Sequence, residues 1–279
     1  MKCLFVSDLH GNKKRYEKLF EMIEKKNPDA VFFGGDLLPN SFRMDCDIDE
    51  FLEEEFFSKA KKYHEQTRFF VIMGNDDPRV FEKHFIDADK KGLIEYVSEK
   101  TIKFNDLFVT GYPFVPPTPF QLKDWERYDV SRFVDVGGIS PEEGIRTFDV
   151  DKDRVRFSTI SEDLENIVKN APAEKTIFLF HSPPYNSNLD RAGLDGKMVD
   201  SAPMDVHVGS IAIQRFIEKY QPFLTLHGHI HETVSLTGQW REKFGKTVSF
   251  TGSSYDSELV LINFDTDNLE KAERMVFTI

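Results

Sequence analysis

The feature that most constrains the fold is an apolar run that ends in side chains of the kind that bind metal ions. Residues 4–9 read Leu-Phe-Val-Ser-Asp-Leu, and His10, Gly11 and Asn12 follow them. Asp8 and His10 stand two positions apart, and an extended chain points two such side chains to the same side. Four later apolar runs also end in oxygen or imidazole side chains. We therefore expect a sheet with polar ligands gathered at one edge.

The order of the elements indicates that this sheet is largely parallel. Residues 13–26 carry apolar side chains at helical spacing between two apolar strands, the second of which is 30–34. Strand, helix and strand in this order form a parallel pair with a right-handed crossover. Ligands of such sheets lie beyond the carboxyl ends of the strands, where Asp8, His10 and Asp36 would all be found.

The pattern continues along the chain. Helices are predicted at 49–63, around 81–88, at 161–170 and after Gly209, and strands at 68–73, 176–180 and 223–226. Short strands near 93–97, 101–104 and 107–111 are typical of an antiparallel meander, and the C-terminal part predicts antiparallel strands at 233–236, 247–251, 258–264 and 274–278.

Two segments have no periodicity, namely 112–159 and 185–208. The first is rich in proline and aromatic residues, and irregular segments of this length inside a compact domain are usually functional or disordered. Because aromatic side chains are costly to leave in water, an ordered flap beside the site is favoured over a linker between domains.

Composition narrows the functional classes. A chain of 279 residues with 40% hydrophobic side chains can form one large domain or two small ones. The net charge of −12 argues against non-specific binding to nucleic acid or anionic membranes. Cys3 and Cys46 have no CxxC spacing and are interpreted as reduced structural thiols. Without a signal peptide or a membrane-spanning run, we expect a soluble cytoplasmic protein.

Collected from the strand ends, the candidate metal ligands are Asp8, His10, Asp36, Asn75, His181, His229 and His231. Taken singly, each motif also has a structural interpretation, such as a capped turn or a helix start. Oxygen and imidazole ligands without thiolate favour divalent Mn, Fe, Zn, Ni or Co, with Mn the first choice in vitro. Seven ligands exceed the needs of one tetrahedral ion and suit two ions a few ångströms apart.

The chain resembles the calcineurin-like metallophosphoesterase family over residues 8–231. The motifs that carry the resemblance are Asp8-Leu9-His10, Gly35-Asp36, Gly74-Asn75-Asp76-Asp77, His181 and Gly228-His229-Ile230-His231. The resemblance implies an α/β fold, a four-layer α/β/β/α sandwich of two mixed sheets, with residues 1–279 as a single domain and flap-like insertions at about 112–159 and 185–208. It also implies one cation held by Asp8, His10, Asp36 and His231, and a second held by Asp36, Asn75, His181 and His229.

The resemblance further implies hydrolysis of a small phosphate ester by a hydroxide that bridges the two cations. The family usually has a histidine after the metal-binding asparagine, which protonates the leaving group or stabilises charge, and here that place is taken by Asp76. We expect Asp76 and His10 to be catalytic, and Asn12 and His207 to contact the substrate, while His227 supports a neighbouring ligand or packs within its strand.

The aspartate bears on substrate preference. Two divalent cations, the carboxylates of Asp8 and Asp36 and one hydroxide would together leave one net positive charge, which an ionised Asp76 would cancel. A phosphodiester or an activated ester is therefore expected rather than an alkyl monoester. Two alternatives remain open, namely a non-catalytic scaffold of the same fold and a dinuclear hydrolase of another bond, such as an amide or the diphosphate of a nucleotide.

Overall fold

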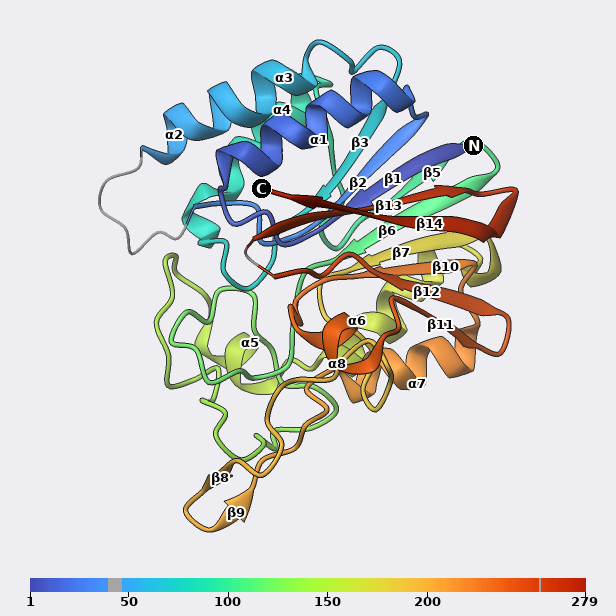
Figure 1. Ribbon diagram of the computed structural model, residues 1–279. Coiled ribbons are helices and arrows are strands. Elements are labelled where there is room, and N and C mark those ends of the chain that lie inside the picture. The colour runs from blue at the N-terminus through green and yellow to red at the C-terminus, as the bar shows by residue number, and fades with distance from the viewer. Residues whose placement is uncertain (40–46, 256) are drawn as a thin grey trace.

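Two mixed sheets packed face to face, with helices on both outer sides, form the architecture (Figure 1). The computed structural model describes residues 1–39, 47–255 and 257–279. In Figure 1, α1 to α4 lie above the first sheet, and α6 and α7 lie below the second. The α/β/β/α sandwich is therefore confirmed.

The first sheet has the strand order β14-β13-β1-β2-β3-β4. Its strands are β1 (Lys2–Val6), β2 (Ala30–Gly34), β3 (Arg68–Ile72), β4 (Glu95–Tyr96), β13 (Glu258–Asp265) and β14 (Asn268–Thr278). The strands β1 to β4 run parallel, and β13 pairs antiparallel with both β1 and β14.

The second sheet has the order β11-β12-β10-β7-β6-β5. Its strands are β5 (Thr101–Phe104), β6 (Leu107–Tyr112), β7 (Thr176–Phe180), β10 (Leu224–His227), β11 (Arg241–Phe244) and β12 (Thr247–Thr251). The four inner strands are parallel, while β5 and β11 pair antiparallel at the two edges. A separate hairpin is formed by β8 (Met198–Val199) and β9 (Ala202–Pro203).

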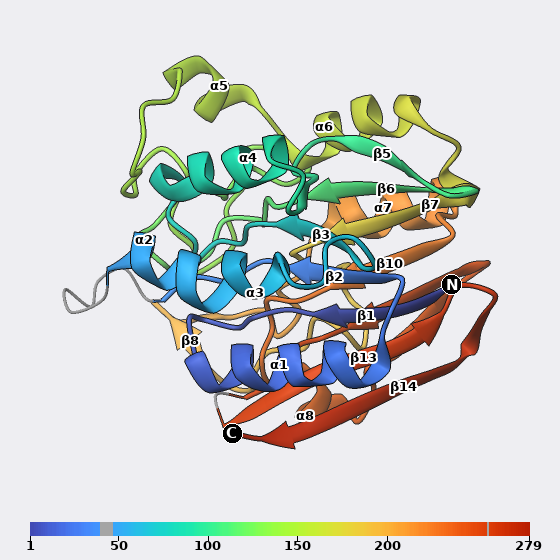
Figure 2. The same ribbon diagram turned by 90° about the horizontal axis from the view of Figure 1, so that it is seen from above.

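Helices complete the outer layers. They are α1 (Lys13–Lys26), α2 (Ile48–Phe51), a π-helical stretch (Leu52–Phe57), α3 (Ser58–Ala60), α4 (Glu82–Lys90), α5 (Lys152–Phe157), α6 (Ile160–Ile167), α7 (Ile211–Tyr220) and α8 (Thr233–Thr237). Seen from above, α1, α3 and α4 lie over the strands of the first sheet (Figure 2). The Asn12 side chain caps α1 by accepting the amides of Lys14 and Arg15.

Successive side chains of a strand point to opposite faces of the sheet, and this alternation decides which side chains meet. On β1, Cys3 and Phe5 face the second sheet, whereas Leu4 and Val6 belong to the cluster that packs under the helices. Between the sheets the rings of Phe32 and Phe70 lie 5.0 Å apart. Strands buried on both faces read as continuous apolar runs, which explains why these strands are visible in the sequence.

The structure corrects two secondary-structure predictions. The expected meander at 93–111 is divided, because β4 joins the first sheet in parallel while β5 and β6 form a hairpin in the second. The expected strand at 233–236 is the helix α8. Its first and last residues, Thr233 and Thr237, both donate hydroxyl hydrogen bonds to the Asn188 carbonyl, so tertiary contacts outweigh the strand preference of β-branched residues.

The irregular segment after β6 is packed against the strand-end loops. The Trp125 side chain is fully buried, and its indole N–H donates to the Asp77 carbonyl at 2.8 Å. Nearby, Lys123 and Glu126 form a fully buried ion pair of 2.6 Å. Cys3 is buried with a free thiol, while Cys46 lies outside the described residues. Within the described part of the chain, no helix has both the length and the apolar character needed to cross a bilayer.

Candidate metal centre

The residues expected at the strand ends come together where the two sheets meet. Asp8 and His10 follow β1, Asp36 follows β2, His181 follows β7 and His229 lies just beyond β10. Among the described residues, three groups of metal-type side chains result, within each of which the ligand atoms lie at most 4.8 Å apart. Two of them are the candidate ligand sets, Asp8, His10 and His231, and Asp36, His181 and His229, and the third consists of His10, Asp36 and Asp76.

The separations within each set match those of ligands that share one cation. Nε2 of His10 lies 3.0 Å from Nε2 of His231, and His231 Nε2 lies 3.7 Å from Asp8 Oδ1. Ligands about 2.1 Å from an ion stand about 3.0 Å apart in an octahedron and about 3.4 Å apart in a tetrahedron. The first set therefore fits a single divalent ion.

The second set has similar geometry. Nε2 of His181 lies 3.0 Å from Asn75 Oδ1 and 3.2 Å from Asp36 Oδ2. The Nδ1–H of His181 donates to the Gly34 carbonyl at 2.7 Å, which directs Nε2 toward the carboxylate and amide oxygens. A hydrogen bond of this kind commonly orients a metal-binding histidine. Asp36 also groups with His10, so its carboxylate lies between the two sets.

The backbone at this centre is strained. Asp8, His10, Asp36 and His229 have φ angles of 58°, 46°, 54° and 75°, in the left-handed region that side chains other than glycine seldom adopt. Such residues cost of order 1 kcal/mol or more each and persist when the surroundings impose them. At each of these residues the left-handed backbone turns the chain sharply after its strand, and the side chain points into the centre.

Hydrogen bonds donated by backbone amides stabilise these turns, and one of them links the two sheets. The amides of Asp8 and His10 donate to the carbonyls of Gly35 and Asp36 at 3.0 and 2.8 Å. The amide of His229 donates to Asp8 Oδ1 at 3.0 Å. The loops after β1, β2 and β10 therefore hold one another in register.

Glycines allow the loops to approach this closely. A Cβ added at Gly74 would lie 2.3 Å from Asp36 Oδ1, and one added at Gly228 would lie 2.0 Å from Ser7 Oγ and 2.8 Å from Asp8 Oδ2. These distances are shorter than van der Waals contact allows. Any larger residue would displace a candidate ligand.

The centre contains two buried carboxylates, whose negative charge requires positively charged partners. The side chains of Asp8 and Asp36 are 1% and 2% exposed. Burial alone would raise the pKa of Asp8, but its hydrogen bond to His231 and the charges of the surrounding histidines lower it. Burial would likewise lower the pKa of His181, yet the Asp36 carboxylate raises it to about 10. Buried carboxylates need a cation or a metal as partner, so the donor set fits divalent ions.

Asp76 lies at the mouth of the centre. Its side chain is 51% exposed, its Oδ2 lies 3.8 Å from His10 Nδ1, and its amide donates to Asp36 Oδ1 at 2.8 Å. Desolvation and the carboxylates of Asp36 and Asp77 raise the pKa of Asp76 to about 7. Divalent cations would act in the opposite direction because they favour the ionised form.

Asp77 has a structural role that the sequence did not indicate. Its buried carboxylate accepts the amides of Leu37 and Leu38 through Oδ1 and that of Gly74 through Oδ2, at 2.7 to 2.9 Å. It thereby ties the loop after β2 to the loop after β3. Arg15 was also missed, because a single arginine in a helix carries no signal. Its guanidinium donates to the Asp8 carbonyl at 2.6 Å.

The structure gives the remaining predicted residues different places. The Asn12 oxygen caps α1, and Asn12 is not among the residues that line the cavity beside the centre. The His227 ring is buried, stacks on Phe180 and contacts the Ser182 carbonyl at 2.9 Å, so it serves strand packing. His207 lines the cavity.

This cavity has a volume of about 490 Å³. Asp36, Asn75, Asp76, His229 and His231 form one wall of it. The opposite walls come from the irregular segments, residues 116–138 and 185–209. A molecule held at the candidate ligand sets would therefore extend between these two segments.

Comparisons with known proteins agree with this geometry. The sequence model of the calcineurin-like phosphoesterases matches residues 1–233. Protein 078R of Invertebrate iridescent virus 3, whose name assigns it to the phosphoesterases, is 31% identical over 136 residues, which are 42% of this chain and 37% of the viral protein. The chain thus matches little more than a third of that relative's length.

Solved structures show the same fold. The protein TT1561 of Thermus thermophilus superposes with a TM-score of 0.60 at 17% identity, covering 98% of this chain and 97% of that one. A dimetal phosphatase from Danio rerio gives a TM-score of 0.56 at 9% identity, covering 100% and 98%. The chain belongs to the calcineurin-like phosphoesterase family.

Proposed function

We propose that the protein is a dinuclear metal-dependent phosphoesterase that prefers phosphodiesters or activated esters to alkyl monoesters. The observation that carries the proposal is the position of the Asp36 carboxylate between two sets of ligand atoms. One ion would be held by Asp8, His10, Asp36 and His231, and the other by Asp36, Asn75, His181 and His229. The name dimetal phosphatase of the Danio rerio neighbour supports a pair of ions.

Two divalent cations would bind the phosphoryl oxygens and make a hydroxide available near neutral pH. The protein's own residues place the reacting groups. The loops fixed by Asp77 and by the His229 amide hold the ligands rigidly, and such positioning lowers the barrier by orienting the reactants. His10 belongs to the first ligand set, with its Nε2 3.0 Å from that of His231, and its Nδ1 lies 3.8 Å from Asp76 Oδ2.

The preference for diesters follows from charge. Two divalent cations, the carboxylates of Asp8 and Asp36 and one hydroxide leave a single positive charge, and ionised Asp76 cancels it. A dianionic monoester is then attracted less than a monoanionic diester. Ionised Asp76 also has no proton to donate to the leaving group, which favours esters whose leaving group departs without protonation.

His207 is proposed as a substrate contact. Its Nδ1 lies 2.7 Å from Asp190 Oδ1. The Asp190 carboxylate is fully buried and also accepts the amides of Asn186, Ser187 and Gly209. Since Asp190 holds Nδ1, Nε2 is the ring nitrogen left for a ligand in the cavity.

The deciding experiment loads the metal-free protein with Mn²⁺ and compares bis(p-nitrophenyl) phosphate, p-nitrophenyl phosphate, glycerol 2-phosphate and a nucleotide panel. Metal content is measured in the same samples. Two ions per chain, with the highest kcat/KM on the diester, are expected. Faster turnover of glycerol 2-phosphate than of the diester would contradict the proposed preference, and a single tightly bound ion would contradict the dinuclear centre.

A further inference from the structure

We propose that the cavity beside the metal centre receives an apolar ester group without negative charge, and that this selects the substrate. The inference rests on the proposed function, because it concerns the part of a phosphodiester that does not leave. It assigns a role to the two irregular segments, residues 112–159 and 185–208, which the ligand set does not explain. The evidence is the shape, the apolar lining and the charge of the cavity.

The cavity has the size of a small-molecule site. Its volume of about 490 Å³ lies within the range of roughly 300–1,000 Å³ that ligand pockets occupy. Since candidate metal ligands form one wall, a phosphoryl group at the centre would direct one of its ester groups into this space.

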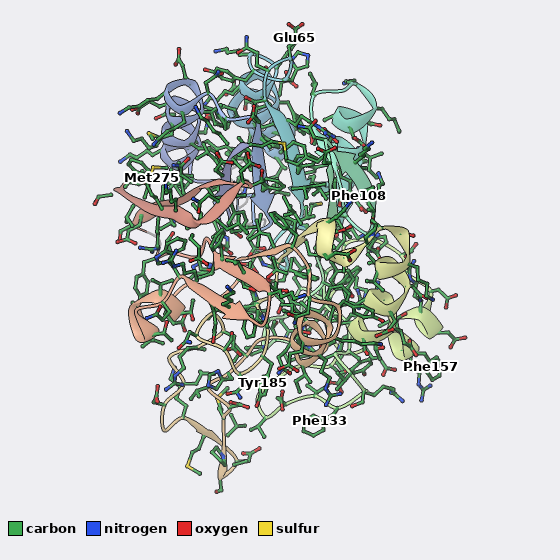
Figure 3. The ribbon with its side chains drawn as sticks, turned by 90° about the vertical axis from the view of Figure 1, so that its right-hand side faces the viewer. Glu65, Phe108, Phe133, Phe157, Tyr185 and Met275 are labelled. Carbon is green, nitrogen blue, oxygen red and sulfur yellow. The ribbon has the colours of Figure 1, made fainter. Side chains whose placement is uncertain are left out.

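The lining is mainly apolar and contains aromatic side chains that are exposed. Among the described phenylalanines, three are strongly exposed, namely Phe120 (54%), Phe133 (70%) and Phe157 (59%), and the first two line the cavity. Figure 3 shows Phe133 and Tyr185 at the same lower end of the molecule, and both residues line the cavity. The lining also includes three prolines and apolar side chains from both irregular segments, among them Val136, Leu194 and Met204. Exposed apolar side chains gathered in one place mark a binding surface.

The charge of the lining excludes anionic groups. Among the described residues that line the cavity there is no lysine or arginine, whereas Asp129, Asp135, Asp205 and Glu232 line it in addition to Asp36 and Asp76. Asp205 accepts the Tyr185 hydroxyl at 2.7 Å, and burial together with the charge of Asp205 raises the pKa of Asp135. A second phosphate or a carboxylate on the ester group would meet these carboxylates without a counter-ion.

Binding of phosphinates tests this inference without turnover. The phosphinate group carries one negative charge and has no ester bond to hydrolyse. Methyl(phenyl)phosphinate, dimethylphosphinate and (4-carboxyphenyl)methylphosphinate are titrated into the Mn²⁺-loaded protein by calorimetry. We expect the phenyl compound to bind about tenfold or more tightly than the dimethyl compound, because burial of a ring is favourable, and the carboxylated ring to bind about tenfold more weakly than the phenyl compound. Equal affinities of the phenyl and dimethyl compounds, or tighter binding of the carboxylated one, would overturn the inference.

Matched variants separate the cavity from general effects. Phe133→Ala should lower the affinity ratio of phenyl to dimethyl compound at least threefold, while Phe157→Ala, a similarly exposed phenylalanine on α5 outside the cavity, leaves the ratio unchanged. Asp135→Asn should reduce the penalty of the carboxylated ring. Asp106→Asn, in the exposed turn between β5 and β6, is its control. Equal effects of a variant and its control would refute the assignment.

A hydrolysis assay distinguishes this inference from the proposed function. Phenyl p-nitrophenyl phosphate and methyl p-nitrophenyl phosphate share one leaving group, so their kcat/KM ratio reports only the second ester group. If neither compound is hydrolysed although the phosphinate preference holds, the proposed function fails and the inference stands. If both are hydrolysed at equal kcat/KM and the phosphinates bind equally, the function stands and the inference fails.

Discussion

Replacing Asp77 by asparagine tests whether this residue builds the metal centre by tying two loops together. The Oδ1 atom accepts two amides, those of Leu37 and Leu38, and Oδ2 accepts that of Gly74 at 2.9 Å. Asparagine keeps one acceptor oxygen and replaces the other by an NH₂ group. In the better of its two orientations, the NH₂ faces the Gly74 amide, so that two donors oppose each other.

The expected loss of stability follows from this count. A hydrogen bond to a charged group contributes about 1.5–3 kcal/mol, and an unsatisfied buried donor adds a cost of its own. We expect Asp77→Asn to lower the free energy of unfolding by about 2–4 kcal/mol. For a chain of this size, about 2–4 °C per kcal/mol gives a fall in Tm of roughly 4–16 °C.

A second consequence concerns the metal. The loops that Asp77 joins carry Asp36 and Asn75, so their displacement should weaken Mn²⁺ binding by about 10- to 100-fold, as is usual when residues supporting metal ligands are lost. Thermal unfolding with and without Mn²⁺ and titration calorimetry measure the two effects.

Asp124→Asn is the matched control. Asp124 is also fully buried and accepts the amides of Arg79 and Thr147 at 2.8 and 2.9 Å, but it binds no residue of the loop after β2 and contacts the loop after β3 only at its end, at Arg79. It should lower Tm by a similar amount and leave Mn²⁺ affinity unchanged. The reasoning is refuted if Asp77→Asn unfolds within about 1 °C of the wild type, or if both variants lose metal affinity equally.

Four further predictions address the chemistry and the flap. Asp76→His should raise turnover of esters with poor leaving groups by about tenfold or more, since a positioned acid contributes 10²- to 10⁴-fold, and an unchanged rate on an alkyl diester would remove Asp76 from proton transfer. His207→Gln should lower kcat/KM about tenfold. The control is His84→Gln, which should leave kcat/KM unchanged, because the His84 ring pairs with a surface aspartate at 3.0 Å. Equal kcat/KM values of wild type and His207→Gln would exclude a contact between His207 and the substrate. Removal of metal by EDTA should abolish hydrolysis, and Mn²⁺ at about 100 times its Kd should restore it. The same Mn²⁺ concentration should add about 2.7 kcal/mol per site to the free energy of unfolding, measured by urea denaturation. Glu126→Leu should lower the free energy of unfolding by about 3–5 kcal/mol because it leaves the buried Lys123 ammonium without its carboxylate partner. The double variant Lys123→Met/Glu126→Leu should recover most of this loss. A single variant as stable as the double variant would contradict the prediction.

The fold and the ligand types were readable from the sequence because they depend on local patterns. A strand buried on both faces must be apolar throughout, and the polar residue that follows it marks its end. This is why Asp8, Asp36 and His181 were recognisable one by one. The parallel order of β1 and β2 also followed from the sequence, since two strands joined by one helical crossover in the same sheet run in the same direction.

Other elements depended on contacts between distant segments. The helix α8 replaces an expected strand because Thr233 and Thr237 bind the Asn188 carbonyl, a contact over about 45 residues that no local pattern reports. Asp77 belongs to a motif that carries the family resemblance, but its role as acceptor of three backbone amides is set only by the folded loops around its carboxylate.

The sequence by itself determined the buried inner strands and the side chains that stand at their ends, because hydrophobic period and strand termini are properties of short stretches. The tertiary structure alone decided the left-handed turns at the ligands, the place of Arg15 under Asp8 and the acidic, apolar cavity beside the centre. The physical reason is that these features arise where buried polar groups from different loops must satisfy one another, and their partners become known only once the two sheets are packed.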